Sequence, residues 1–171
     1  SIRYAMTLMF AAMLHHYLGD VKGVATRAQE INVLAYTHGY AYHQVSGPLF
    51  AGWALVQEGQ PHVGIAQMQA ALAARRASEH RLFFPYELAL LGEAHLSAGQ
   101  PAAGLAVVAE ALAVTAMTGE CVWQAELRRL RAELLLAQGA AAEEVAACCW
   151  EALELARAQD ARSLELRAAT S

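Results

Sequence analysis

Apolar residues recur at three- and four-residue spacings along nearly the whole chain, in long stretches that glycine separates. The segment 49–56 shows this pattern ahead of Gly59, and Ile65, Met68 and Leu72 continue it afterwards. Such spacing is typical of amphipathic helices, whereas apolar and polar residues alternate in half-buried strands. The pattern predicts paired helices over 2–18 and 21–37, 41–58 and 61–77, 82–98 and 101–117, and 121–138 and 141–159, with a last helix from about 162.

Four of the separating glycines lie 40 residues apart: Gly19, Gly59, Gly99 and Gly139. Their surroundings recur as well, because Gly-Gln-Pro-His-Val-Gly at 59–64 is matched by Gly-Gln-Pro-Ala-Ala-Gly at 99–104. A fixed interval of this size indicates stacked supersecondary units. Glycine accepts the left-handed conformation that ends a helix, and a proline two residues later suits the first turn of the next helix. The four glycines are therefore predicted to be structural turns, one inside each unit.

The composition favours an all-helical protein. Apolar residues make up 57% of the chain, many of them alanine, and only 4 residues are proline. We therefore predict an all-α fold, a right-handed α-α superhelix (solenoid) of about four helix pairs in one continuous array over 1–171. The expected units are 1–39, 40–79, 80–119 and 120–160, with 161–171 as the start of a truncated fifth. The turns between units are expected at 37–39, 78–80 and 118–120.

The units resemble tetratricopeptide repeats. The small residue of the first helix falls on Ala12, Gly52, Gly92 and Ala132, and the small residue at the helix crossing falls on Gly64 and Gly104. Small residues at these positions allow two helices to pack closely. The unit has 40 residues rather than the usual number of about 34, which implies longer helices.

Four segments resemble one family more specifically: 52–55, 90–94, 125–130 and 163–171. They look like the C-terminal repeat arrays of large bacterial signalling proteins that join a class III nucleotide cyclase to a P-loop ATPase module. The superhelical domain of the maltose-regulon activator is a related array. The resemblance implies a non-catalytic regulatory or protein-interaction segment, since the chain has neither a Gly-x-x-x-x-Gly-Lys-Ser/Thr loop nor a cyclase metal-binding pattern.

In tetratricopeptide arrays the first helices line a concave groove that holds a peptide or a domain. The corresponding positions predict these groove residues: Met9, Met13, Tyr17, Leu49, Trp53, Tyr86, Glu93 and Arg129. Aromatic residues and methionine are favoured in adaptable binding surfaces. The alternative is that a neighbouring unit, a missing fifth unit or a second copy of the chain covers these side chains. Two further functions stay open, a small-molecule effector sensor and a purely structural or dimerising spacer.

Charge limits the possible partners. The net charge is −4, and of the two basic clusters, 75–76 and 128–131, the second has Glu126 and Glu133 beside it. We interpret that cluster as a solvated, salt-bridged helix face and expect no nucleic-acid partner. A peptide-carboxylate clamp is not expected, because Arg129 is the only clear cation among the groove positions.

The remaining chemistry indicates a binding module rather than an enzyme. None of the seven histidines has metal-ligand spacing, so we expect no metal and no cofactor. The sequence contains no stretch of about 18 uncharged apolar residues, so no membrane-spanning helix is expected. Three cysteines without a disulfide framework fit a cytoplasmic protein. The start at Ser1 and the end at Ser171 within a helical pattern look like those of an excised fragment. Its exposed apolar end predicts a homodimer or end-to-end association.

Overall fold

The computed structural model describes residues 1–78 and 82–170, and every element in these ranges is helical. Glu79 and His80 of the turn expected at 78–80 lie outside the described residues, as does Ser171. The elements are α1 (Ile2–Tyr17), α2 (Val21–His38), α3 (Ala41–Gln57), α4 (Pro61–Ala77), α5 (Phe84–Ser97), α6 (Pro101–Thr118), a 3₁₀ helix η1 (Cys121–Trp123), α7 (Gln124–Gln138), α8 (Ala142–Ala158) and α9 (Arg162–Thr170). The predicted all-α class is confirmed, and the α-helices begin and end within two residues of the predicted positions, except that α7 begins three residues late because Cys121–Trp123 form a 3₁₀ helix.

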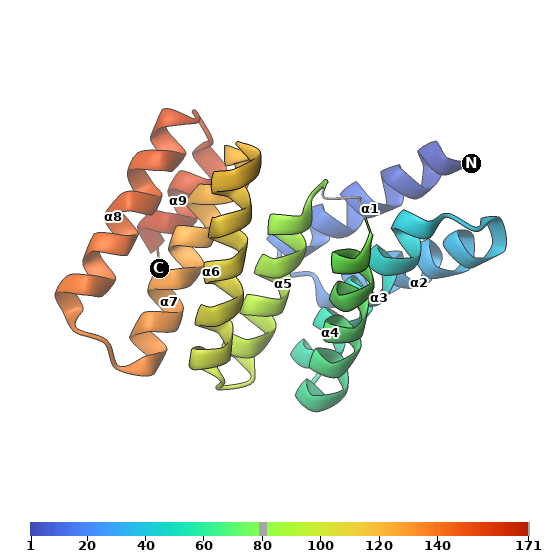
Figure 1. The fold of residues 1–171 in the computed structure, drawn as a ribbon, viewed down its shortest axis with the longest axis horizontal. Coiled ribbons are helices and arrows are strands. Elements are labelled where there is room, and N and C mark those ends of the chain that lie inside the picture. The colour runs from blue at the N-terminus through green and yellow to red at the C-terminus, as the bar shows by residue number, and fades with distance from the viewer. Residues whose placement is uncertain (79–81, 171) are drawn as a thin grey trace. The chain divides into compact units, whose positions relative to one another are not determined.

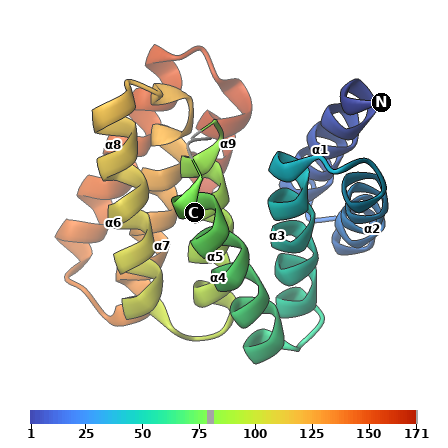
Figure 2. The ribbon, with the colours of Figure 1, turned by 45° about the vertical axis from the view of Figure 1, so that its right-hand side comes forward.

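The chain divides into two compact units, Ser1–Leu82 and Phe83–Ser171. In the first unit α1 packs against α2, α2 against α3 and α3 against α4, and α1 also contacts α3 (Figure 1). In the second unit α5 to α9 pack in the same consecutive way (Figure 2), and α7 also contacts both α5 and α9. Consecutive antiparallel packing follows from the short turns, which place each helix beside the one before it in the chain. The superhelix and its 40-residue repeat stay predictions.

The four glycines spaced 40 residues apart all have a left-handed backbone, with φ of 69°, 84°, 68° and 82°. At Gly59 the glycine amide donates to the carbonyl of Val56 at 3.1 Å, and the amide of Gln60 donates to that of Leu55 at 2.9 Å. These two bonds are the Schellman pattern, which satisfies carbonyls that a helix end would leave unpaired. The same pair of bonds forms at the other three glycines. Each glycine therefore reverses the chain into the next helix in the same way.

Within two of the helix pairs, glycines also lie where the helices cross. A Cβ atom added at Gly52 of α3 would be only 2.7 Å from the carbonyl oxygen of Gly64 on α4. The matching pair in the second unit is Gly92 and Gly104, where an added Cβ on Gly104 would be 3.3 Å from the carbonyl oxygen of Gly92. The helices therefore approach at the positions that the small-residue pattern predicts.

Helix α6 is unusually apolar for its exposure. Its 18 residues have a mean hydropathy of 1.5, yet only 28% of them are buried. By length and composition it is the one helix in the described residues that could cross a membrane, a test that many core helices of soluble proteins also pass. The helix contains Glu110 and packs against α5 and α7.

The helix crossing gives the first prediction. Gly52→Ala should destabilise the first unit by about 1–3 kcal/mol, because the new methyl group meets a backbone oxygen that cannot rotate away. Gly92→Ala is the matched control, since its Cβ would lie 3.0 Å from side-chain methyl groups of Leu130 and Val108 and at an ordinary contact distance of 3.9 Å from the nearest backbone oxygen, that of Gly104. Urea unfolding followed by circular dichroism measures both variants. Equal losses in the two variants would contradict the backbone contact as the cause.

Candidate functional site

The predicted groove residues are mostly buried. Five of them are at most 7% exposed: Met9, Met13, Leu49, Trp53 and Tyr86. Arg129 is also buried, while Tyr17 and Glu93 are half-buried. These five side chains are thus buried in the folded chain.

In the first unit the predicted groove positions of α1 and α3 meet in an aromatic cluster. The ring of His16 contacts that of Trp53 edge-on, with 4.9 Å between the ring centroids. His16 also lies against Tyr17, at 5.2 Å between centroids. The structure thus brings Tyr17 and Trp53 together through a histidine, and this cluster connects the two first helices.

In the second unit the same helix positions carry charge. Nη2 of Arg129 on α7 lies 2.7 Å from Oε1 of Glu126, and Nη1 of Arg129 pairs with Glu133 one turn later. The Nε atom of Arg129 donates to both oxygens of the Glu126 carboxylate at 3.1 Å. From α5, Oε1 of Glu93 lies 3.7 Å from Nη2 of Arg129. One guanidinium therefore joins three carboxylates from two helices.

A second arginine completes this arrangement from α9. Nη2 of Arg167 donates to Oε1 of Glu126 at 2.8 Å and lies 3.7 Å from Oε1 of Glu93. The first-helix charge row is therefore defined by five residues on α5, α7 and α9: Glu93, Glu126, Arg129, Glu133 and Arg167. Its three carboxylates and two guanidinium groups leave one net negative charge.

One expectation from the sequence is corrected by the charge row. Arg129 is salt-bridged to Glu126 and Glu133 as expected, but it is 6% exposed rather than part of a solvated face. Arg167, which is not one of the predicted groove positions, joins the row from α9. Burial alone lowers the pKa of the Arg129 guanidinium. The hydrogen bond and charge of Glu126, followed by the charges of Glu133 and Glu93, outweigh burial and raise this pKa above its ordinary value.

The ring contacts of Tyr86 were not predicted from the sequence. Its ring lies 5.0 Å from that of Trp123, measured between centroids, and Trp123 also contacts Phe83. The indole Nε1 of Trp123 donates to Oε1 of Glu120 at 2.8 Å. Trp123 belongs to η1 at the start of the α7 segment, so these contacts pack the beginning of α5 against the beginning of α7.

A buried polar cluster in the first unit was also missed. Arg75 on α4 is 1% exposed and donates to the carbonyl of Tyr42 at 3.1 Å and to the hydroxyl of Ser46 at 3.2 Å. Its guanidinium carbon lies 4.0 Å from the centroid of the Tyr42 ring, a cation–π contact. A signal did exist, since Arg75 continues the three- and four-residue spacing of Met68 and Leu72.

His43 lies beside this cluster and is 1% exposed. Neither of its ring nitrogens has a hydrogen-bond partner within residues 1–78 and 82–170. Burial lowers the pKa of His43 below its ordinary value, and the charge of Arg75 lowers it further. Both effects favour the neutral imidazole of His43 in the folded protein.

The chemistry of the described residues is that of ion pairs and apolar contacts. Each carboxylate of the charge row lies within ion-pair distance of a guanidinium. Burial raises the pKa of the Cys148 thiol, which makes the nucleophilic thiolate scarcer. No group of three or more metal-binding side chains occurs in the part of the chain that the structure describes.

Comparisons with models of protein families, with curated proteins and with solved structures found no match to this chain. The structure therefore defines its class by fold alone, as an all-helical protein of consecutively packed helices.

The charge row gives the second prediction. Arg129→Met should lower the free energy of unfolding by about 3–5 kcal/mol, because it leaves the buried Glu126 carboxylate short of its main partner. Arg128→Met is the matched control on the same helix. Arg128 pairs with Glu151 where both are partly exposed, so its loss should cost less than about 1 kcal/mol. Denaturant unfolding measures both, and similar losses would contradict a special role of the buried network.

The third prediction concerns pH. Because the pKa of His43 is lower in the folded protein than in the unfolded chain, the unfolded chain takes up the proton first as the pH falls below about 6.5. The stability of the first unit should therefore be full above this pH and fall below it. His43→Leu should flatten this dependence, whereas His62→Leu at an exposed position should keep it. Unfolding curves at several pH values measure how steeply the free energy of unfolding falls as the pH is lowered. An unchanged pH dependence in His43→Leu would refute the attribution of this fall to His43.

Proposed function

We propose that this chain is a non-catalytic protein-interaction and regulatory scaffold module of a larger bacterial signalling protein. In this proposal it is a cytoplasmic array of tetratricopeptide-like helix pairs with a 40-residue repeat. Its first helices present a surface to a peptide or to another domain, including domains of the parent chain. A homodimer is part of the proposal, and a nucleic-acid partner is not.

Two structural features support the repeat in this proposal. The left-handed turns recur at 40-residue intervals with the same hydrogen bonds. The small residues that the tetratricopeptide pattern needs at the helix crossing do meet there, at Gly52 with Gly64 and at Gly92 with Gly104. Helix pairs of this kind bury their apolar faces only against neighbouring pairs, so they form scaffolds with long faces.

The single observation that carries the proposal is the first-helix charge row. It connects the first helices of three consecutive pairs, α5, α7 and α9, and its outer members are accessible: the side chains of Glu133 and Arg167 are 31% and 30% exposed. Ion pairs on helices hold their charged atoms in fixed places, which gives a partner specificity in orientation. The buried centre supplies rigidity, and the exposed edge supplies the groups that a partner can contact.

The composition of this surface indicates the partner. The row carries one net negative charge, and the exposed Leu136 lies one turn beyond Glu133 on α7. A polar or basic peptide segment with an apolar side chain matches such a surface in charge and polarity. This is a different chemistry from the apolar groove that the sequence predicted.

The fourth prediction tests this function in the complete parent protein in its own cell. A photo-crosslinking amino acid replaces Leu136 beside the charge row, and in a control it replaces Trp150 on α8; both residues are 62% exposed. We expect position 136 to capture one protein, or one segment of the parent chain, that position 150 does not capture. Adding Glu133→Lys should reduce the yield, because it reverses a charge on the surface.

Equal capture from the two positions would refute the first-helix surface as the binding surface. Catalytic turnover by the purified chain would refute the non-catalytic part of the proposal.

A further inference from the structure

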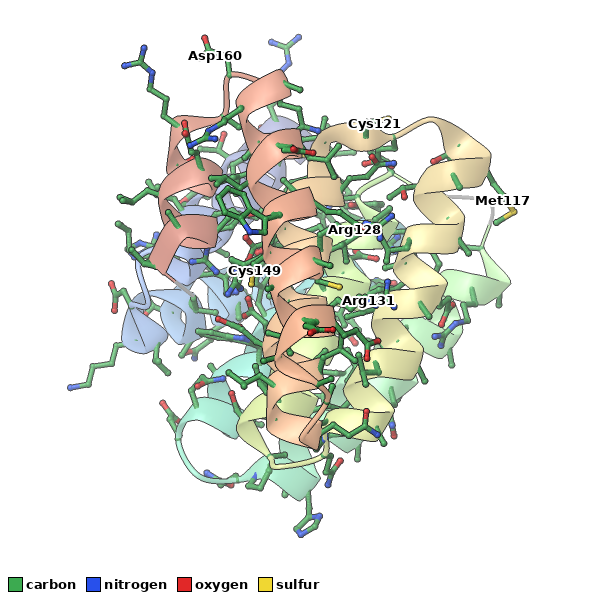
Figure 3. The ribbon with its side chains drawn as sticks, turned by 90° about the vertical axis from the view of Figure 1, so that its left-hand side faces the viewer. Met117, Cys121, Arg128, Arg131, Cys149 and Asp160 are labelled. Atoms are coloured by element: carbon green, nitrogen blue, oxygen red, sulfur yellow. The ribbon has the colours of Figure 1, made fainter. Side chains whose placement is uncertain are left out.

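A groove lies between α6 and α7 on the other side of α7 from the charge row. It has a volume of about 490 Å³ and six lining residues: Leu105, Ala109 and Leu112 from α6, and Arg128, Arg131 and Leu135 from α7. Residues 128, 131 and 135 fall on one helical face, and residues 126, 129 and 133 fall on the opposite face, because each residue turns the helix by about 100°. Figure 3 labels both groove arginines, which project from α7 between α6 and α8 in that view.

Three leucines and an alanine line the groove beside the two arginines, and three of these four apolar residues belong to α6. Only 28% of α6 is buried although its mean hydropathy is 1.5. The leucines at 105 and 112 lie seven residues apart, a span of about 10 Å or two helical turns. This length matches the anchors at positions i, i+3 or i+4, and i+7 of a helix that docks into a groove.

Acidic groups compensate only part of the positive charge that the two arginines bring to this groove. Arg128 pairs with Glu151 of α8 at 2.7 Å. Arg131 is half-buried and makes no ion pair or hydrogen bond with any residue that the structure describes. Glu144 and Glu151 are the acidic groups that, with the two arginines, act on the nearby Cys148. A guanidinium partly removed from water and left without a counter-charge attracts an anion.

We propose that this groove docks an acidic amphipathic helix of a partner protein. Apolar side chains of that helix pack against Leu105, Leu112 and Leu135. A carboxylate binds Arg131, and a second one, three or four residues away, reaches Arg128, because the two arginines are themselves three residues apart on one helix face. Arginine suits this role because its fork of donors matches a carboxylate. The span of two turns favours a helix over a small anion, which would fill only the part of the groove beside Arg131.

This inference goes beyond the proposed function, since it concerns the opposite face of α7. Its failure would leave crosslinking from position 136 unchanged, and failure of that crosslinking would leave binding at this groove unchanged. The two results are therefore distinguishable.

The fifth prediction uses a designed, fluorescently labelled helical peptide of about three turns. Leucines form its apolar stripe, and two glutamates lie four residues apart beside the stripe. Fluorescence anisotropy with the whole chain gives the Kd. We expect Arg131→Gln to raise this Kd about tenfold, the effect of losing one carboxylate–guanidinium pair. Arg128→Gln should raise it less, because Glu151 already competes for that arginine.

Two controls make the test specific. Arg162→Gln removes the same charge at a side chain that is 90% exposed near the start of α9, and it should leave the Kd unchanged. A peptide with glutamines in place of its glutamates should bind the unaltered chain about tenfold more weakly, and Arg131→Gln should not weaken it further.

Three outcomes would overturn the proposal. The first is equal affinity for the glutamate and glutamine peptides, and the second is an equal loss with Arg131→Gln and Arg162→Gln. The third is binding of octanoate that depends on Arg131 while the peptide does not bind, which would assign the groove to a small carboxylate instead of a partner helix.

Discussion

The close approach of the two helices in the pairs α3–α4 and α5–α6 is the constraint on which the rest of the structure depends. At Gly52 and Gly64 the backbones come so near that a single added carbon would contact a carbonyl oxygen. The left-handed turn at Gly59 fixes how the second helix leaves the first. Turn and crossing together set the rotation of each helix about its axis, and this rotation decides which residues face the neighbouring helix. The rotation of each helix therefore determines which side chains come together in the aromatic cluster, the charge row and the groove.

The two units use the same helix positions for different chemistry. In the first unit Trp53 and Met13 fill them, and apolar burial is sufficient to hold α1 against α3. In the second unit Glu126 and Arg129 fill them, and taking these charges out of water has a large desolvation cost that only mutual pairing offsets. Charged groups also need defined partners, whereas apolar groups tolerate many. The second unit therefore gains defined contacts between α5, α7 and α9 rather than a larger core.

Much of the fold follows from the sequence because its signals are local. Apolar periodicity located the helices, and glycine at the left-handed turns located their ends. The candidate sites were harder, because burial depends on neighbours far along the chain. Arg129 has the charged neighbours Glu126 and Glu133 in sequence, which is typical of an exposed helix face, yet Glu93 and Arg167 from two other helices enclose it. Trp53 likewise occupies a predicted groove position in the sequence. In the structure its ring instead packs against that of His16 from another helix.

Helix α7 shows why net charge is a poor guide to the partner. The chain carries −4 overall, which by itself disfavours an acidic partner. Charges in solution are screened beyond about 10 Å at ordinary ionic strength, so a docking segment responds mainly to the groups beside it. On one face of α7, ion pairs with the carboxylates of Glu126 and Glu133 neutralise the charge of Arg129. On the opposite face Arg131 lies among leucines without an acidic partner in the described residues. In the two proposals, the same helix therefore binds a basic segment on one side and an acidic one on the other, which would let a single rigid element join two different partners.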